Sequence, residues 1–258
     1  MEIDMLAVER RSRIEQTILK NKTVLVPELA KEFDVTTETI RSDLEKLEKQ
    51  GVLVRTYGGA TLVESREADM GIHERETVNF EGKQSIGMRA AELIKDGETV
   101  FLDASTSSLH LARNIKNKKS VTVITNAEKI VMELADCPDI KVICTGGLLH
   151  AKNMSYIGRV VEDTIRSTYF ANKVFFSCRG VTLSRGLMES TEAEAEIKKA
   201  MIECSESAIF LCDRKKLGRL GVPVISGLDK IDFFITDIKL DEEWNKALEN
   251  FDVRLITV

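Results

Sequence analysis

The sequence predicts an α/β protein in which a small N-terminal winged helix-turn-helix is joined to a larger, mostly parallel α/β domain. Two observations carry this prediction. Residues 7–62 show helical periodicity and then a short hairpin pattern, whereas from Thr99 onwards short apolar runs alternate with helical patterns. Apolar strands that alternate with helices are typical of a parallel sheet covered on both faces. We therefore assign residues 1–62 to the first domain, 63–80 to a polar linker and 81–258 to the second domain.

Three helices are predicted in the first domain. The segment 13–21 places Ile14 and Ile18 on one face, so the first helix packs through that stripe. A short second helix has Pro27 near its first turn, where the missing amide donor costs least. Thr36 is a favourable N-cap for a longer third helix.

The third helix is expected to run to about Gln50, with Gly51 following at its C-terminal position. At about 100° per residue, its apolar and polar side chains fall on opposite sides. The apolar side holds Ile40, Leu44 and Leu47, and the polar side holds Glu38, Arg41, Ser42, Glu45 and Lys49. In a helix-turn-helix this last helix enters the major groove of DNA. The residues that alternate around Gly58-Gly59 suit a two-stranded wing.

Charge leaves a second interpretation of the first domain open. Residues 1–62 contain ten Lys or Arg and eleven Asp or Glu, a net charge of −1. DNA-binding domains usually carry a basic surface. From the pattern alone, a three-helix bundle that only packs against the second domain is the alternative to DNA binding.

Composition excludes several other classes of protein. The net charge of the whole chain is −5, so no globally basic coat for nucleic acid is present. The five cysteines form no CxxC pair and lie near no histidine cluster, which argues against a disulfide framework or a zinc site. No apolar stretch approaches the roughly 20 residues that span a bilayer, and the N-terminus lacks a signal-peptide pattern. We expect a cytoplasmic protein with no membrane partner, metal or other cofactor.

Seven apolar runs are the predicted strands of the second domain. They are Thr99–Leu102, Val121–Thr125, Lys141–Thr145, Lys173–Cys178, Ala208–Cys212, Phe233–Thr236 and Val253–Val258. In open parallel sheets, ligands bind beyond the carboxyl ends of the strands. The residues that follow each run are therefore the candidate binding residues.

Polar, small or cationic residues follow five of these runs. Ser105, Thr106 and Ser107 lie just before a predicted helix, where hydroxyls and free amides suit a phosphate. Ordinary helix capping uses the same residue types. The other strand ends carry the pairs Thr125-Asn126 and Gly146-Gly147 and the cations Arg179 and Lys216, and Asp103 opens the first loop. This convergence predicts an anionic ligand.

The segment TTETIRSDLEKLEKQGVLVRTYGGATL at 36–62, with Arg10, Ile14 and Ile18 upstream, resembles the helix-turn-helix signature of the DeoR family of bacterial regulators. The resemblance implies binding to double-stranded operator DNA, whereas Asp43 is expected to be structural because phosphate repels a carboxylate. The family commonly has a second basic residue where this chain has Ser42. The implied DNA-binding residues are Thr37, Thr39, Arg41, Ser42, Arg55 and Tyr57.

The second domain resembles the sensor domain of the same family, which is related in fold to ribose-5-phosphate isomerase and binds sugar phosphates. The resemblance implies that Thr106 and Ser107 hold phosphate, that Lys216 neutralises it, and that Asp103 and Asn126 read sugar hydroxyls. Two positions depart from the family loop, with Ser105 in place of glycine and Ser107 in place of a second threonine. Arg179 stands where a smaller or acidic residue is common, which implies an additional anionic group on the effector. The implied effector-binding residues are Asp103, Ser105, Thr106, Ser107, Thr125, Asn126, Gly146, Gly147, Arg179 and Lys216.

The resemblance leads to a hypothesis for the mechanism. The chain would repress a carbohydrate catabolic operon under the control of a phosphorylated sugar. We expect a homo-oligomer, at least a dimer, because two helix-turn-helix units must meet two half-sites. Effector binding would shift the DNA-binding heads through the linker, which requires the effector to favour one arrangement over the other.

The alternative from another class is a sugar-phosphate isomerase that carries a DNA-binding domain. It needs a general base beside the substrate carbon, for which Asp103, Asp213, Glu192 and Glu194 are candidates by composition only. Glu194 and Lys198 are four residues apart, a spacing typical of a solvated ion pair. An isomerase would have no use for an intact helix-turn-helix, so we expect no enzymatic activity.

Overall fold

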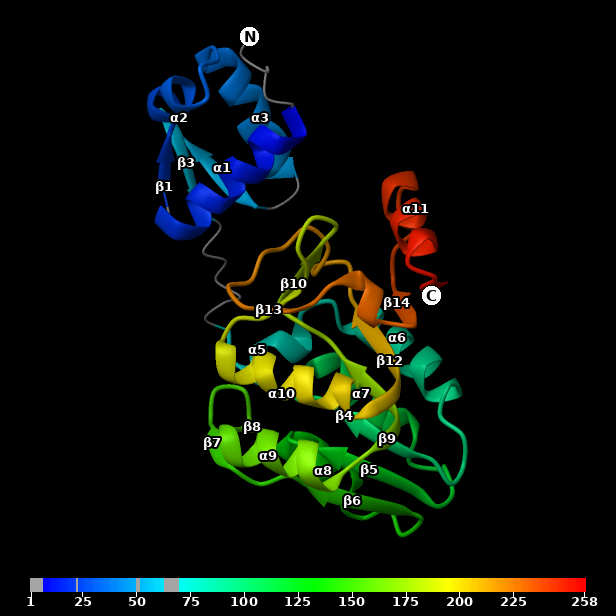
Figure 1. The fold of residues 1–258 in the computed structure, drawn as a ribbon. Coiled ribbons are helices and arrows are strands. Elements are labelled where there is room, and N and C mark those ends of the chain that lie inside the picture. Colours follow the sequence, from blue (N-terminus) through cyan, green and yellow to red (C-terminus); the bar gives the residue numbers. More distant parts are fainter. Residues whose placement is uncertain (1–6, 22, 50–51, 63–69) are drawn as a thin grey trace. The chain divides into compact units, whose positions relative to one another are not determined.

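A computed structural model describes residues 7–21, 23–49, 52–62 and 70–258 (Figure 1). The chain divides into two compact units, which are residues 1–69 with 218–220 and residues 70–217 with 221–258. The expected C-terminal glycine of the third helix, Gly51, and the first part of the predicted linker, 63–69, lie outside the described residues.

The first unit has the predicted three helices and a small antiparallel sheet. Its elements are α1 (Ala7–Asn21), β1 (Thr23–Leu25), α2 (Val26–Glu32), α3 (Thr37–Lys49), β2 (Leu53–Thr56) and β3 (Gly59–Leu62). The sheet order is β1-β3-β2. Strand β1 is an addition to the prediction, because three residues of which only Val24 is buried give no detectable period. The third helix starts as expected, with the Thr39 amide donating to Thr36 Oγ1 at 3.1 Å.

The core of the first unit follows the predicted helix faces. Ile14 and Ile18 of α1 are fully buried, and they belong to one apolar cluster with Ile40, Leu44 and Leu47 of α3. These five apolar residues therefore pack where the helical period places them.

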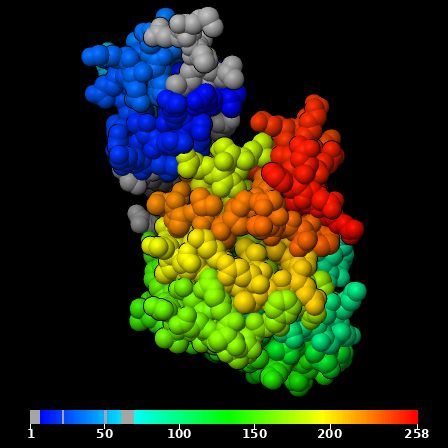
Figure 2. Space-filling view, in the orientation of Figure 1, coloured from blue at the N-terminus to red at the C-terminus, as the bar shows by residue number. Residues whose placement is uncertain are grey.

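The second unit is built on one seven-stranded sheet with the order β15-β14-β12-β9-β4-β5-β6. Every neighbouring pair in it is parallel. The strands are β4 (Thr99–Leu102), β5 (Val121–Thr125), β6 (Ile140–Cys144), β9 (Ala171–Phe176), β12 (Ser205–Cys212), β14 (Phe233–Thr236) and β15 (Arg254–Thr257). The predicted parallel α/β architecture is confirmed. The C-terminal residues, red in Figure 2, lie at the surface at one edge of this unit.

Helices cover both faces of the sheet. They are α5 (Ile72–Thr77), α6 (Phe80–Glu92), α7 (Thr106–Asn114), α8 (Glu128–Leu134), α9 (Arg159–Thr168), α10 (Glu192–Glu203) and α11 (Glu242–Asn250), with a 3-10 turn at Leu228–Lys230. Helices α6, α7 and α8 share one apolar cluster with the sheet, and α9, α10 and α11 share the other. Side chains alternate along each strand, so Phe175 enters the first cluster and Phe176 the second.

Short strands follow two of the sheet strands at their carboxyl ends. After β6 the chain forms a hairpin of β7 (Leu148–His150) and β8 (Ser155–Ile157). After β9 it forms β10 (Gly180–Thr182) and β11 (Gly186–Met188), which pair with each other, and β11 also pairs with β13 (Val224–Ser226). The sequence prediction contained none of these strands. They lie beside the strand ends where a ligand is expected.

The predicted linker 63–80 is wrong at its C-terminal end, because α5 and the first residue of α6 fall inside it. The sequence of α5 is polar, but Ile72 is buried and Glu76 is ion-paired with Arg113 and Lys129 at 2.6 Å each. Tertiary contacts therefore hold a helix that its own periodicity does not reveal.

Candidate functional site

The order of the strands reverses between β4 and β9, the point at which a crevice for a ligand is expected in an open parallel sheet. The chain runs from β4 to its neighbour β5 and on to β6, and then returns to β9 on the other side of β4. In parallel sheets the ligand site lies where the strand order reverses in this way. The residues that follow β4 and β9 are therefore at the centre of the candidate site.

Asp103, directly after β4, connects the two sides of this crevice. Its side chain is buried, with 1% exposure. The carboxylate accepts hydrogen bonds from Ser105 Oγ at 2.7 Å and Ser108 Oγ at 2.5 Å. It also accepts one at 3.1 Å from the backbone amide of Ser177, which follows β9. Asp103 thus holds the loop after β4 against the end of β9.

Lys198 of α10 lies at the same place between two carboxylates. Its Nζ is 3.2 Å from Asp103 Oδ2 and 2.6 Å from Glu189 Oε1, and all three side chains are at least nine-tenths buried. Burial by itself opposes the charged forms, but Glu189 and Asp103 raise the pKa of Lys198, and Lys198 lowers the pKa of Glu189. The two carboxylates therefore favour the charged form of Lys198, and Lys198 favours the charged form of Glu189.

The interpretation of Glu194 and Lys198 as a solvated pair is wrong. Both lie on the inner face of α10, and they are 4% and 5% exposed. Each instead contacts other partners. Glu194 Oε1 accepts a hydrogen bond from Ser155 Oγ at 2.6 Å, whereas Lys198 contacts Asp103 and Glu189. One sequence signal pointed to this, since Lys198 falls three residues before Met201, on the apolar face of the helix.

The N-terminus of α7 opens beside Asp103. Ser105 is its N-cap, and its Oγ accepts from the Ser108 amide at 3.1 Å. Thr106 and Ser107 form the first turn and are buried. Amides of a first helical turn lack intrahelical partners and favour an anion. A serine where the family loop has glycine therefore serves here as a helix cap.

Asn126 and Thr145 stand at the ends of the neighbouring strands β5 and β6, and both are more than nine-tenths buried. Asn126 Nδ2 donates to the Tyr156 carbonyl at 3.0 Å. Asn126 Oδ1 and Thr145 Oγ1 have no hydrogen-bond partner among the residues that the structure describes. Buried polar atoms are rarely left unpaired, so these two oxygens suit a bound molecule.

The remaining predicted residues of β5 and β6 have structural contacts. The hydroxyl of Thr125 donates to the Leu102 carbonyl at 2.6 Å and accepts from the Ala127 amide at 3.0 Å. Gly146 and Gly147 have φ angles of +67° and +111°. A Cβ on Gly147 would lie 2.3 Å from Val161 Cγ2, so this glycine permits α9 to pack closely.

The two predicted cations lie in the loops after β9 and β12. Arg179 is half-buried, and its amide donates to the Met188 carbonyl at 2.9 Å. Lys216 is also half-buried, and its charge contributes to lowering the pKa of Glu189. Lys216 therefore adds positive potential close to the buried Lys198 group.

The carboxylates proposed for an isomerase are mostly engaged by the protein itself. Asp103 and Glu194 have the contacts given above, and Asp213 Oδ1 accepts from the Lys215 amide at 3.0 Å. Glu192 is exposed at the start of α10. The carboxylates at the crevice thus position loops of this chain.

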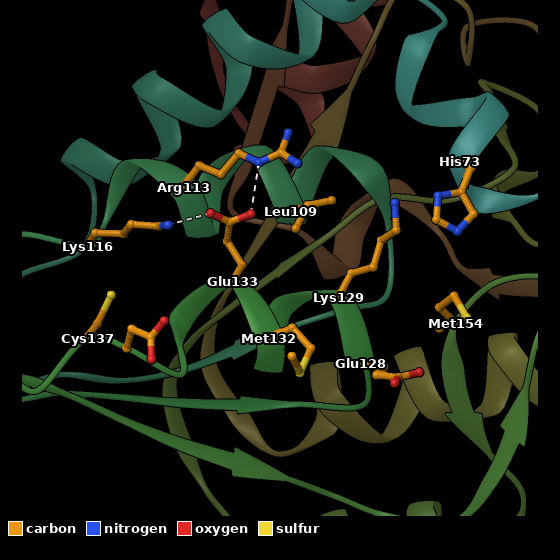
Figure 3. A pocket seen from close by; sticks show the side chains of 11 residues that line it. His73, Leu109, Arg113, Lys116, Glu128, Lys129, Met132, Glu133, Cys137 and Met154 are labelled. Carbon is orange, nitrogen blue, oxygen red and sulfur yellow. Dashed lines mark hydrogen bonds and ion pairs between the residues drawn. The ribbon is translucent and has the colours of Figure 1, made fainter.

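A separate hollow of about 640 Å³ lies over α7 and α8, away from the predicted binding residues (Figure 3). Its charged lining is largely paired, because Glu133 accepts from Arg113 at 3.1 Å and from Lys116 at 2.5 Å. Met154 of the β7–β8 turn and His73 of α5 stand together on one side of it.

In the first unit, α3 presents the predicted polar face to solvent. Thr37, Arg41 and Ser42 are exposed and Thr39 is half-buried. Arg41 forms an ion pair of 3.2 Å with Glu38. The polar face of the helix is thus accessible to a partner.

Asp43 is structural, as expected. It is 2% exposed, and its carboxylate is paired with Arg10 at 2.6 Å and Arg11 at 3.2 Å. The pair fastens α1 to α3 and explains the arginine of the upstream motif.

The wing has one constrained and one free side chain. Arg55 Nε is held by Glu48 Oε2 at 2.8 Å. Tyr57 is fully exposed next to Gly58, whose φ is +88°. Of the two predicted wing contacts, Tyr57 is therefore the more accessible.

Two family models match the chain, the DeoR-like helix-turn-helix domain over residues 10–66 and the DeoR C terminal sensor domain over residues 78–238. The chain belongs to the DeoR family. It is therefore a helix-turn-helix transcriptional regulator, and the family resemblance of the sequence is confirmed.

Several relatives match this DeoR-family protein over nearly their whole length. The HTH-type transcriptional regulator YulB of Bacillus subtilis is 39% identical, with 98% of each chain covered. The HTH-type transcriptional regulator GolR of Listeria innocua is 34% identical, with 95% of this chain and 94% of the relative covered. The L-fucose operon activator of Haemophilus influenzae is 30% identical, with 96% and 98% covered.

Among solved structures, ribose 5-phosphate isomerase A of Methanocaldococcus jannaschii matches 55% of each chain at 15% identity and a TM-score of 0.40. The full-length sorbitol operon regulator SorC of Klebsiella pneumoniae matches 96% of this chain and all of its own at 10% identity and a TM-score of 0.39. These scores are too low to carry an argument about function.

Within the described ranges, every helix is too short or too polar to cross a membrane.

Proposed function

We propose that this DeoR-family protein is a cytoplasmic repressor of a carbohydrate catabolic operon, and that a phosphorylated sugar bound at the carboxyl ends of β4, β5, β6, β9 and β12 releases it from operator DNA. The observation that carries the sensor half is the pair of buried, unpaired oxygens of Asn126 and Thr145 beside the open N-terminus of α7. A sugar phosphate supplies both an anion for the helix and hydroxyl donors for the oxygens.

The phosphate would bind at the first turn of α7, where Thr106 and Ser107 offer backbone amides and hydroxyls. Lys216 and Arg179 would contribute positive charge from the neighbouring loops. Asn126 Oδ1 would accept a hydrogen bond from a hydroxyl of the sugar. This proposal gives Asp103 a different role from the one expected, because its two oxygens already accept from Ser105, Ser108, Ser177 and Lys198. Asp103 would therefore orient the loop.

The DNA half rests on the exposed face of α3. Arg41 and the hydroxyls of Thr37, Thr39 and Ser42 would reach bases or phosphates in the major groove. The wing residues Arg55 and Tyr57 would contact the DNA backbone. Two copies of the chain would bind two half-sites, so the working form is a homo-oligomer.

The names of the relatives support a carbohydrate operon, since one of them is an L-fucose operon activator. Repression is the direction that we propose for this chain. Family membership supports a regulator that acts without catalysing a reaction on its effector.

The test is a DNA-shift titration on the region upstream of the protein's own gene. It is repeated with hexose phosphates, pentose phosphates and glycerol phosphate, with inorganic phosphate as the control for charge. We expect specific binding that one sugar phosphate reverses without being consumed. Binding that no compound changes would contradict the sensor half, and consumption of the compound would support the isomerase alternative.

A further inference from the structure

The β7–β8 hairpin contacts both the candidate effector site and α5, the first described element after residues 63–69 (Figure 1). At its near end, the Tyr156 amide donates to the Asn126 carbonyl at 2.7 Å, and Asn126 Nδ2 donates back to the Tyr156 carbonyl at 3.0 Å. In the turn, the Met154 carbonyl accepts a hydrogen bond from the Glu128 amide at 3.0 Å. Asn126 is therefore joined to Tyr156 of β8 by hydrogen bonds in both directions.

The far end of the hairpin holds α5. The Ile72 amide, the first of the helix, donates to the Lys152 carbonyl in the turn at 2.9 Å. Arg75 donates from its guanidinium to Asn153 Oδ1 at 2.9 Å. The hairpin turn thus holds α5, which lies near the start of the second unit.

Asn153 joins α5 to the buried charges of the sensor. Its Oδ1 accepts from Arg75, and its Nδ2 donates to Glu194 Oε1 at 3.1 Å. Glu194 lies one helical turn before Lys198, and its charge contributes to the raised pKa of that lysine. Lys198 in turn contacts Asp103 at 3.2 Å. Hydrogen bonds therefore join α5 to Glu194 through Asn153, and an ion pair joins Lys198 to the loop after β4. Between Glu194 and Lys198, one helical turn apart on α10, the interaction is electrostatic.

We propose that Asn153 is a coupling residue, through which occupancy of the strand-end site changes the position of α5 and hence DNA binding. This inference rests on the proposed function. Asn153 is half-buried, and both the oxygen and the nitrogen of its side-chain amide form hydrogen bonds. A shift of Glu194 or of β8 therefore changes the partner available to Arg75. Coupling between two sites requires an element that both of them bias, and the hairpin turn has contacts on both sides.

The first test compares Asn153→Ala with the wild-type full-length chain. DNA affinity is measured by DNA shift and sugar-phosphate affinity by calorimetry, with the compound that releases the wild type. Allosteric coupling weakens DNA binding by about fivefold or more. We expect N153A to bind DNA and the sugar phosphate like the wild type. In this variant, however, the sugar phosphate should weaken DNA binding by less than about twofold. Wild-type release, or loss of sugar-phosphate binding in N153A, would overturn the proposal.

Two further variants sharpen this result. Asn153→Asp keeps an acceptor for Arg75 but has no donor for Glu194, so it should also lose release, and full release in it would exclude the Glu194 route. Asn245→Ala removes an amide that donates to the Leu240 and Asp241 carbonyls at the start of α11. This control should release DNA like the wild type.

A second measurement needs no effector. Coupling is reciprocal, so binding of operator DNA must change the hairpin. We expect hydrogen exchange of the amides at 150–156 to change when operator DNA is added to the wild type, and to stay constant in N153A. Constant exchange in the wild type would overturn the coupling role. A protein that shows this change but responds to no sugar phosphate would contradict the proposed effector and leave the coupling supported.

Discussion

The polar face of α3 and the rim of strand ends in the second unit are both assigned to binding, but their side chains are held in opposite ways. On α3, Arg41 and Ser42 are exposed, and the local partner of Arg41 is a neighbour on the same helix. At the rim, Asp103 and Asn126 are buried and make contacts that cross between strands. A substitution on α3 should therefore change binding with little change in stability. A substitution of a rim residue that makes such contacts should change both binding and stability.

The largest effect on stability is expected at Lys198, whose ammonium group lies between two buried carboxylates at the rim. Lys198→Met leaves Asp103 and Glu189 buried without their cation, and breaking a buried ion pair costs about 3–5 kcal/mol. Urea denaturation of the full chain measures this loss. The neighbouring variant Lys199→Met removes a one-third-exposed pair with Glu196 and should stay near the wild type.

The pH dependence of the difference in stability between the wild type and K198M tests the same buried ion pair. Burial opposes the charge of Glu189, but Lys198 lowers its pKa below the ordinary 4.5. A lowered folded-state pKa contributes stability above the unfolded pKa, and this contribution is lost as the pH falls through the folded pKa. The gap between wild type and K198M should therefore narrow below about pH 4.5. A gap that widens in acid would contradict the charge assignment.

The next-largest loss of stability is expected at Asp43, the buried carboxylate of α3. Asp43→Ala leaves Arg10 without its partner and should lower the stability of the first unit by about 3 kcal/mol. DNA binding would be lost on warming while the second unit keeps its unfolding transition, which calorimetry resolves. Glu38→Ala, an exposed carboxylate on the same helix, serves as the control for stability.

Arg41→Ala tests the exposed side of the comparison. Loss of a base contact costs about 1–3 kcal/mol of DNA affinity. The free energy of unfolding should stay within about 0.5 kcal/mol, because the lost pair with Glu38 is exposed. Arg13→Ala, on the exposed surface of α1, should leave DNA affinity unchanged. Equal losses in both variants would indicate non-specific charge effects and contradict the assignment of α3.

The smallest change in stability is expected at Thr145. Its hydroxyl is unpaired within the described part of the chain, so Thr145→Val should leave the free energy of unfolding within about 0.5 kcal/mol. It should weaken sugar-phosphate binding by about 1 kcal/mol, roughly fivefold. Thr125→Val provides the contrast, because that hydroxyl is paired on both sides and its loss should cost about 1–3 kcal/mol of stability. Similar stability in both variants would contradict the distinction between paired and unpaired hydroxyls.

The same contrast explains what the sequence could predict. The strands β4, β5 and β14 lie at the predicted residues, because each is a continuous apolar run. The exposed face of α3 followed from its period. The loops after β4, β5 and β6 followed from the general rule for parallel sheets.

The missed residues are those whose position depends on distant parts of the chain. Glu189 reaches Lys198 because the Glu189 amide is held by the Pro223 carbonyl, 34 residues further along. Asn153 lies in a turn whose flanking strands have only three residues each. No local period marks either position, and a charged residue such as Glu194 suggests solvent until its partners are known.

The strand order also has a consequence for synthesis on the ribosome. Strand β5 joins the edge of β4 and β6 joins the edge of β5, after which β9 joins the free edge of β4. Strands β12, β14 and β15 then extend that side one after another. No strand is ever inserted between two that are already paired. A nascent chain can therefore build the sheet outward from β4 without reopening earlier pairings, and β15 is the last strand to join.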